Sequence, residues 1–465
     1  MLMPRREPIV NDKYIRQVLS RERDEDDVWV HEILAKARDL KGLNQSDMIG
    51  LMSIQSSALL NSLFETARYV KDSIYGKRLV VFAPMYISNL CRNECTYCAF
   101  RANNHEISRR TLTQEEIAEE TRALVRTGHK RVLLVAGEAY PKEGFQYVLD
   151  AIDTIYSVRE DHGEIRRVNV NVAPLTDSEF ALLKQKKVGT YQLFQETYNR
   201  KVYKEVHCSG KKADYDWRLG AMDRALTAGL GDVGIGVLFG LCDWRYEMLA
   251  LKSHIEYLER RYGIGPHTIS VPRLEPADGS VISAAPPAPV DDATFQKLVA
   301  ILRIAVPYTG IIMSTRETPS LRRKSFDVGV SQISAGSRTN PGGYSRDAGD
   351  DACQFSLGDH RPLDEVIRDV ATLGYLPSFC TSCYRLGRVG GDFMDMAKPG
   401  DIRQHCDPNG VATFKEYLTD YASSETQRIG EKCISDALDK MDEHPRAIAE
   451  KMLVKVHQGK RDVYC

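Results

Sequence analysis

The chain has 465 residues, more than one ordinary domain holds, although a barrel of roughly 200 to 250 residues can form a single unit. Its 63 lysine and arginine residues nearly balance 64 aspartate and glutamate residues, so there is no basic field to concentrate nucleic acid or an anionic membrane. No apolar run follows Arg5 and Arg6, and none is long enough to cross a bilayer. We therefore expect a cytoplasmic protein whose partners are small molecules and other proteins. In that reducing compartment its 11 cysteines should be free thiols or metal ligands.

The first 78 residues are charged and show no strand-like alternation. Helical periodicity over residues 28–39 and 46–75 predicts a helical lead-in over residues 1–78. Beyond this segment, short apolar runs alternate with amphipathic stretches. The runs, which we predict to be strands, cover residues 80–86, 132–136, 168–172, 191–194, 233–239, 268–271, 311–314 and 330–333.

The amphipathic stretches between these runs carry the start signals of helices. Thr113 with Glu116, and Thr176 with Glu179, form capping boxes ahead of apolar faces. Repeated alternation of strand and helix predicts a parallel sheet closed into a barrel, because each parallel pair needs a crossover helix. The predicted fold class is thus α/β, a (β/α)8 TIM-type barrel over residues 79–345 with its active site at the carboxyl ends of the strands.

Three cysteines follow the first predicted strand directly. Cys91, Cys95 and Cys98 are separated by three and then two residues, and the aromatic Tyr97 precedes the last of them. Three thiolates can hold three irons of a 4Fe-4S cubane and leave the fourth iron open. The spacing is typical of the radical S-adenosylmethionine (SAM) superfamily, in which SAM chelates the open iron. A structural zinc site is the main alternative, but it would need a fourth ligand.

Polar residues at the ends of the next three predicted strands are candidates to bind SAM. Glu138 follows the second strand in the sequence Ala-Gly-Glu, which is similar to the Gly-Gly-Glu element that holds the SAM ammonium group in that superfamily. Asn171 ends the third strand, and Gln195 and Glu196 follow the fourth, so we expect them to face the cofactor together with Tyr97. The alternative for each is a solvated loop residue or a satisfied core group.

Arg273 follows the sixth predicted strand and is a candidate catalytic residue. Its guanidinium presents the planar fork of donors that binds a carboxylate in two-point fashion. We therefore expect Arg273 to clamp the carboxylate of a substrate at the mouth of the barrel. The alternative is again a solvated or internally satisfied side chain.

A second cysteine group appears after the strand and helix alternation fades near residue 346. Two residues separate Cys380 from Cys383, and 22 separate Cys383 from Cys406. The close pair can reach one metal centre from a single turn, and the distant thiolate closes the site. Zinc with His405 as a fourth ligand, and a redox disulfide, are the alternatives. We predict that residues 346–465 form a mainly helical domain that binds an auxiliary iron-sulfur cluster.

The chain resembles the radical SAM tyrosine lyases, and among them the maturases that make carbon monoxide and cyanide for the di-iron centre of FeFe-hydrogenase. Four segments carry the similarity: residues 85–91, 265–274, 380–388 and 396–400. The related lyases of thiazole synthesis share the barrel pattern but not the C-terminal cysteine trio, so that trio favours the maturase.

This resemblance implies SAM and two 4Fe-4S clusters, one at each cysteine group. Reductive cleavage of SAM would yield a radical that takes hydrogen from the amino group of L-tyrosine and splits the Cα–Cβ bond, giving p-cresol and dehydroglycine. The auxiliary cluster would bear an extra iron held by free cysteine, where the second fragment becomes carbon monoxide and cyanide. His267 begins the sixth strand, near the opposite mouth, and is a candidate ligand of that iron; capping of the strand start is its alternative role.

The resemblance also implies a reductant such as ferredoxin or flavodoxin, and other hydrogenase maturation proteins as partners. Two other functions stay open. A tyrosine lyase that feeds thiazole synthesis would use the C-terminal trio for a structural metal only. A carrier of preformed iron-sulfur clusters would need neither the open cysteine loop nor Glu138 for SAM.

Overall fold

A computed structural model describes residues 8–21, 24–161, 163–346 and 352–465 of the chain. Eight parallel strands form a barrel that closes where Val80 of the first strand pairs with Gln332 of the last. The strands are β1 (Arg78–Ser88), β3 (Arg131–Ala136), β4 (Arg167–Asn171), β5 (Thr190–Glu196), β7 (Asp232–Val237), β8 (Thr268–Ser270), β9 (Gly310–Met313) and β10 (Gln332–Ser334). Each of the eight predicted strands overlaps one of these, and the predicted fold class is confirmed.

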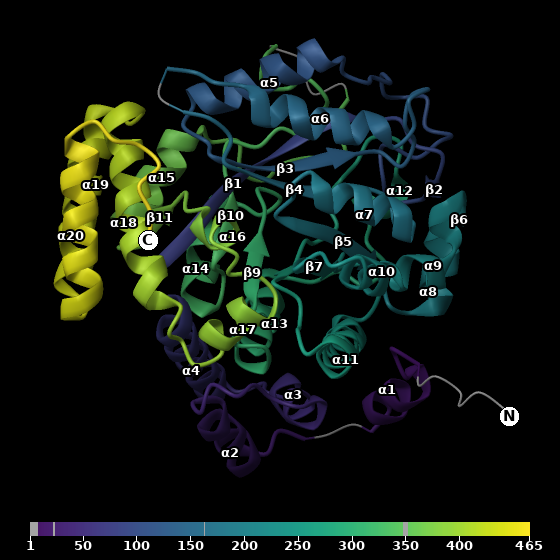
Figure 1. Cartoon of the computed structure of the whole chain (residues 1–465). Coiled ribbons are helices and arrows are strands. Elements are labelled where there is room, and N and C mark those ends of the chain that lie inside the picture. Colours follow the sequence, from purple (N-terminus) through teal and green to yellow (C-terminus); the bar gives the residue numbers. More distant parts are fainter. Residues whose placement is uncertain (1–7, 22–23, 162, 347–351) are drawn as a thin grey trace, which may run out of the picture.

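Helices cover the outside of the barrel and connect its strands (Figure 1). The main ones are α5 (Gln114–Arg126), α6 (Gln146–Ser157), α7 (Asp177–Gln185), α10 (Ala221–Thr227), α11 (Trp244–Tyr262), α13 (Asp292–Ala305) and α14 (Pro319–Val328). Both predicted capping boxes are present, at the starts of α5 and α7. Shorter helices lie in the loops: α8 (Arg200–Val206), the 3-10 turn Lys211–Ala213, α9 (Tyr215–Leu219) and α12 (Val281–Ala284).

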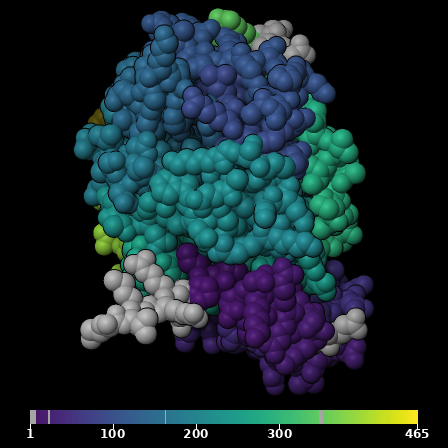
Figure 2. All heavy atoms as spheres, turned by 90° about the vertical axis from the view of Figure 1, so that its right-hand side faces the viewer, coloured from purple at the N-terminus to yellow at the C-terminus, as the bar shows by residue number. Residues whose placement is uncertain are grey.

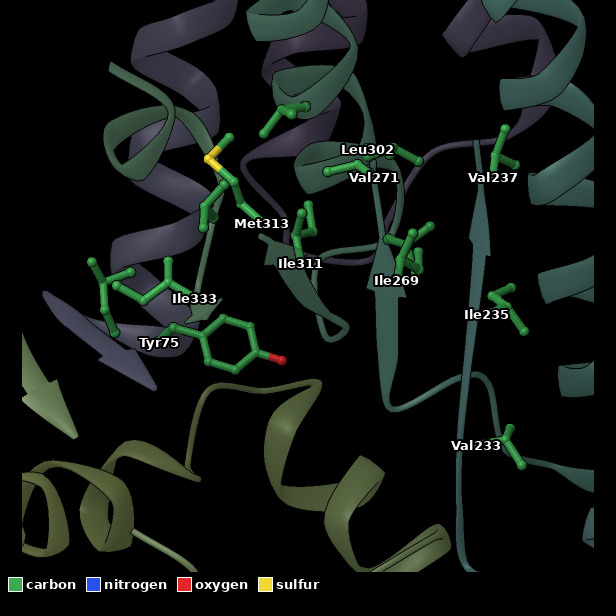
Figure 3. Close-up of a cluster of buried hydrophobic side chains, with 14 of the residues drawn as sticks. Tyr75, Val233, Ile235, Val237, Ile269, Val271, Leu302, Ile311, Met313 and Ile333 are labelled. Atoms are coloured by element: carbon green, nitrogen blue, oxygen red, sulfur yellow. The ribbon is translucent and has the colours of Figure 1, made fainter. Parts of the chain in front are cut away.

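The main hydrophobic core lies between the strands and these helices. Figure 3 shows Val233, Ile235 and Val237 on one side of β7, and all three belong to this core. Because side chains alternate across a strand, the residues between them face the barrel interior. There Gly234 leaves no room for a side chain, since a Cβ would lie 2.5 Å from the hydroxyl oxygen of Thr268. Other core residues drawn in the same view are Ile269, Val271, Leu302, Ile311 and Met313.

Four helices precede the barrel: α1 (Asp12–Leu19), α2 (Asp27–Ala37), α3 (Gln45–Met52) and α4 (Ser57–Tyr75). Figure 2 shows these purple segments gathered at one end of the molecule. The expected helix over 46–75 is divided in two, because the hydroxyl of Ser56 accepts from the amide of Leu59 and begins α4 anew.

Residues 352–465 add one strand and six helices. Strand β11 (Leu376–Ser378) pairs in parallel with the beginning of β1, where Arg78 lies opposite Leu376. The helices are α15 (Leu363–Thr372), α16 (Ser382–Arg385), α17 (Gly391–Ala397), α18 (Arg403–Asp420), α19 (Ser424–Asp439) and α20 (Glu443–His457). In Figure 1 the last three stack beside β11, at the edge of the barrel. Within the described residues, no helix is both long and apolar enough to cross a membrane.

Candidate active site

The first cysteine group lies in a loop that leaves the carboxyl end of β1. Its short strand β2 (Glu94–Cys95) pairs with β6 (His207–Ser209), which fixes the loop against the far side of the barrel mouth. The guanidinium of Arg109 donates to the carbonyl oxygens of Asn89 at 3.0 Å and Phe100 at 2.8 Å, on either side of the cysteines. The loop is therefore held in shape by the protein itself.

The three thiols of this loop lie close enough to influence one another electrostatically. Burial raises the pKa of Cys98 to about 11, and the charge of Cys91 adds to this effect. The pKa values of Cys91 and Cys95 are raised as well, again mainly by burial. The metal-free thiols therefore keep their protons at neutral pH, and a metal must displace these protons. Three soft donors converging from one loop fit the cubane that the spacing predicts.

Glu138 lies beside the cysteine loop. One of its carboxylate oxygens accepts from Asn93 of that loop at 2.8 Å, and the other accepts from Arg218 at 2.9 Å. The preceding Gly137 passes under the loop so closely that a Cβ there would lie 2.1 Å from the carbonyl oxygen of Leu90. This contact explains why a glycine stands before the glutamate.

Glu196 completes a buried charge network at the same mouth. Its carboxylate accepts from Lys212 at 2.8 Å and from Arg218 at 3.4 Å. Burial alone would favour the neutral acid, but the charges of Lys212 and Arg218 outweigh it and lower the pKa of Glu196. Its φ of 70° is in the left-handed region, at a bulge where β5 ends. Such strain in a residue other than glycine is often found at functional sites.

Tyr97 is held in place by a buried histidine. The hydroxyl of Tyr97 donates to Nε2 of His207 at 2.9 Å, while Nδ1 of His207 donates to the carbonyl oxygen of Tyr203. Burial, together with the nearby Lys212, lowers the pKa of His207 to about 2, so the ring stays neutral and its Nε2 can accept. Tyr97 is thereby fixed directly beside Cys98.

A cavity of about 110 Å³ lies inside the barrel below this mouth. Asn171 lines it, and its side-chain amide donates to the carbonyl oxygen of Gln192 at 2.8 Å; its expected contact with SAM stays a prediction. Gln195 is buried but does not line the cavity. Gln354 enters from the C-terminal side, accepts from the Tyr86 hydroxyl at 2.8 Å and donates to the sulfur of Cys98 at 3.8 Å. The cavity is thus directly connected to the cysteine loop.

Arg273 does not line this cavity, and its expected role as the clamp for a substrate carboxylate at the mouth stays a prediction. Its guanidinium lies over the ring of Phe295 on α13 and forms ion pairs with Asp292 and Glu317. Side chains alternate along this segment. Because Ser270 and Pro272 face the cavity, Arg273 faces outward.

Arg316 is the guanidinium that lines the cavity, three residues beyond the end of β9. It lies 3.2 Å from the ring centre of Phe355, and no carboxylate of the described residues forms an ion pair with it. The rule that polar residues at strand ends face the mouth could have found Arg316 in the sequence.

The second cysteine group lies at the opposite mouth. A cavity of about 60 Å³ is lined there by Cys380, Cys383, Cys406 and His267. These residues come from the loop after β11, from α16, from α18 and from the position just before β8. Burial lowers the pKa of His267 to about 4, so its ring is neutral and can offer a lone pair to a metal.

The thiols of Cys383 and Cys406 interact directly. A hydrogen bond between them lowers the pKa of Cys383 and raises that of Cys406. Among the residues that the structure describes, no three His, Cys, Asp or Glu side chains gather tightly enough to hold a single metal ion.

Glu247 gives the fold a pH dependence that can be measured. This fully buried carboxyl on α11 accepts from the amide of Tyr198 at 2.9 Å, and burial raises its pKa to about 7 from 4.5. Between these pH values the native state keeps a proton that the unfolded state has lost, so stability should fall as pH rises. The loss should reach about 3 kcal/mol at most. Buried neutral histidines such as His207 and His267 contribute a slope of the opposite sign below about pH 6.5. The difference in unfolding free energy between the metal-free unmodified protein and Glu247→Gln, measured at pH 5 and pH 8, isolates the contribution of Glu247. Equal slopes in both proteins would contradict the prediction.

Known proteins are similar to this chain in sequence and in fold. The model of the radical SAM superfamily matches residues 85–250, and that of the Biotin and Thiamin Synthesis associated domain matches residues 270–376. The 2-iminoacetate synthase of Escherichia coli (strain K12) is 33% identical over 355 residues, covering 76% of this chain and 91% of that protein.

Two solved structures are similar over nearly the whole chain. A crystal structure of HydG, a maturase of the FeFe-hydrogenase, is 45% identical, with a TM-score of 0.95 over 98% of this chain and 100% of that one. HydG from Carboxydothermus hydrogenoformans is 40% identical, with a TM-score of 0.81 over 95% and 98% of the two chains. The chain therefore belongs to the radical SAM superfamily, and within it to the tyrosine lyases that include HydG and 2-iminoacetate synthase.

Proposed function

We propose that this enzyme splits the Cα–Cβ bond of L-tyrosine and converts the dehydroglycine fragment to carbon monoxide and cyanide for assembly of the di-iron centre of FeFe-hydrogenase. The observation that supports the second step is the presence of a cysteine trio at each mouth of one barrel. The similarity to HydG extends over 98% of the chain, whereas that to 2-iminoacetate synthase covers 76%.

At the first mouth the chain has the residues to hold a 4Fe-4S cluster and SAM. Cys91, Cys95 and Cys98 would bind the cluster, which supplies the electron that cleaves SAM. Glu138 and Glu196 present anionic oxygens for the ammonium and hydroxyl groups of SAM, and both are already oriented by buried cations. The protein's contribution is to fix these groups in a site largely shielded from water.

The cavity inside the barrel is the proposed tyrosine site. It combines apolar walls, such as Phe82 and Phe194, with polar groups at one end, as an aromatic amino acid requires. We assign the carboxylate of tyrosine to Arg316 and not to Arg273, because Arg316 has its charge free inside the cavity.

Replacing Arg316 by methionine should weaken tyrosine binding strongly. A hydrogen bond to a charged group contributes about 1.5 to 3 kcal/mol, so KM for tyrosine should rise roughly 10- to 100-fold. Arg273→Met is the matched comparison and should lower thermal stability instead, since it leaves the buried Glu317 without its partner. Steady-state p-cresol formation and thermal melts of both variants test this assignment. If only Arg273→Met raised KM, the original expectation from the sequence would be right.

At the opposite mouth, Cys380, Cys383 and Cys406 would hold the auxiliary cluster, and His267 an additional iron with free cysteine as a further ligand. The supporting observation is the shared cavity that these four side chains line. A low-potential donor such as ferredoxin or flavodoxin would reduce the first cluster, and other maturation proteins would receive the product. We place these reactions in the cytoplasm.

The test is anaerobic incubation of the reconstituted protein with SAM, dithionite and tyrosine. We expect p-cresol by chromatography and carbon monoxide bound to a reporter haem. A tyrosine lyase for thiazole synthesis is the second candidate, favoured by the 33% identity to 2-iminoacetate synthase. That enzyme would release p-cresol without carbon monoxide. Absence of both products would contradict each candidate.

A further inference from the structure

Gln354 belongs to the segment between β10 and α15, and its side chain reaches the first cysteine group. The amide nitrogen donates to the sulfur of Cys98 at 3.8 Å, and the amide oxygen accepts from the hydroxyl of Tyr86 at 2.8 Å. Gln354 is 256 positions from Cys98 and 268 from Tyr86 along the chain. The tertiary fold alone brings these three side chains together.

The chemistry of a cluster ligand decides which end of the amide faces Cys98. A thiolate bound to iron carries no proton, so its sulfur can only accept a hydrogen bond. The nitrogen of Gln354 must therefore point toward Cys98, which leaves the oxygen to accept from Tyr86. The structure has this orientation, and each end of the amide has a partner.

Tyr86 holds the amide of Gln354 in this position. The Tyr86 side chain is only 5% exposed and packs with Phe100 and Cys98 in a small apolar cluster of the cysteine loop. The rings of Tyr86 and Phe100 meet edge to face, with their centres 6.0 Å apart. The hydroxyl of Tyr86 is therefore fixed relative to the loop, and it fixes Gln354 relative to Cys98.

The backbone around Gln354 is anchored as well. The backbone amide of Gln354 donates to the carbonyl oxygen of Thr339 at 3.0 Å, and the hydroxyl of Thr339 donates to the carbonyl oxygen of Phe355 at 3.2 Å. The ring of Phe355 packs against the guanidinium of Arg316. Of two neighbouring residues, one thus contacts a cluster ligand and the next contacts the arginine that we assign to the tyrosine carboxylate.

A hydrogen bond to a cluster sulfur makes the cluster easier to reduce. The reduced cluster carries one more electron, and part of that charge lies on its sulfurs, so a donor stabilises the reduced state more than the oxidised state. Backbone amides donate to these thiols too, for example that of Phe100 to Cys98. Gln354 adds a side-chain donor, whose contribution a substitution can measure without altering the backbone.

We propose that Gln354 is a positioning residue that raises the reduction potential of the cluster at the first mouth by donating to Cys98. Gln354 forms and breaks no covalent bond. The reductant gives one electron to the cluster, and the hydrogen bond shifts that equilibrium toward the reduced state. The inference rests on the cluster of the proposed function, and not on which substrate is cleaved.

Gln354→Met tests the proposal, because methionine keeps the length of the side chain and removes the donor. A redox titration of the reconstituted protein, followed by electron paramagnetic resonance, should show the equilibrium constant for one-electron reduction falling at least about fivefold. Since tenfold corresponds to about 59 mV for one electron, the midpoint potential should fall by roughly 40 mV or more. Equal midpoints in the unmodified protein and Gln354→Met would overturn the proposal.

Gln192→Met is the matched control. Gln192 lines the same cavity, but its side chain forms no hydrogen bond with the three cysteines in the part of the chain that the structure describes. The substitution removes an amide from the cavity without removing a donor to the cluster, so the midpoint potential should stay unchanged. An equal fall in Gln192→Met and Gln354→Met would attribute the effect to cavity polarity and would overturn the role of the hydrogen bond.

Tyr86→Phe tests whether the amide must be held in place. This variant keeps the ring and the donor but removes the hydroxyl that fixes Gln354, so its midpoint potential should fall less than that of Gln354→Met. Adding Tyr86→Phe to Gln354→Met should lower the midpoint no further, because Tyr86 acts through the amide. Additive falls would overturn this linkage between Tyr86 and Cys98.

The strength of the reductant separates a redox role from structural damage. In a solution poised at the midpoint of the unmodified cluster, a fivefold smaller equilibrium constant lowers the reduced fraction from one half to about one sixth. Gln354→Met should then form 5'-deoxyadenosine about threefold more slowly, and excess strong reductant should restore the rate. A loss that strong reductant does not restore would overturn the redox role.

The same measurements distinguish this inference from the proposed function. A lowered midpoint in Gln354→Met, with no p-cresol from tyrosine in the unmodified protein, would remove the proposed function alone. Formation of p-cresol by the unmodified protein, with an unshifted midpoint in Gln354→Met, would remove the role of Gln354 alone.

Discussion

We expect the double replacement Cys380→Ala with Cys383→Ala to leave p-cresol formation from tyrosine within about twofold of the unmodified rate, and to cut carbon monoxide delivery to a reporter haem by more than roughly 100-fold. Bond cleavage needs only the first cluster, SAM and bound tyrosine, and none of these contacts the second mouth. Making and holding the diatomic products needs a metal at the cavity that Cys380 and Cys383 line. His267→Ala should fall between these limits, because it removes one ligand of several.

Cys433→Ala is the control for this experiment. Its thiol is also buried in the C-terminal part and donates to the carbonyl oxygen of Tyr375 at 3.4 Å, but it does not line the cavity. Both products should form at the unmodified ratio in that variant. Carbon monoxide at the unmodified level in the double cysteine variant would move its synthesis away from the second mouth and favour the thiazole-type lyase.

The second large effect is expected at the first mouth. Replacing Cys98 by alanine should abolish SAM cleavage, so that 5'-deoxyadenosine falls below detection, because two thiolates do not hold a site-differentiated cubane. Cys208→Ala is the control, since this exposed thiol lies in β6, which pairs with the cysteine loop. Anaerobic turnover with SAM and dithionite, followed by chromatography, measures the difference. Continued 5'-deoxyadenosine formation by Cys98→Ala would place SAM cleavage elsewhere in the protein.

The fold could be predicted from the sequence because its signals are local. Each barrel strand overlaps a short apolar run, and some of the helices between the strands begin with recognisable capping residues, such as Thr113 and Thr176. Strands β2, β6 and β11 have two or three residues each, too few to show any periodicity. All three depend on pairing partners more than 100 residues away, as for Glu94 with Ser209 and Arg78 with Leu376.

The site residues likewise include some with local sequence signals and some that only long-range contacts bring together. The cysteines and Glu138 belong to motifs with fixed spacing, so the sequence reveals them. Lys212 and Arg218 carry no motif, and they reach Glu196 and Glu138 only because loops from different strands meet at one mouth. Arg273 illustrates a third case, because it faces away from the cavity that Arg316 lines. Side chains alternate along a strand, so a shift of one residue moves a side chain from the inner face to the outer face.

Strand β1 works as a rigid spacer between the two proposed reaction centres. The cysteine loop leaves its last residue, Ser88, and β11 with the second cysteine group is paired to its first, Arg78. Eleven extended residues at roughly 3.3 Å each span about 35 Å, a length that a hydrogen-bonded strand cannot shorten. Domain closure cannot bring centres at the two ends of one strand together, so only a molecule that travels between them can connect their reactions.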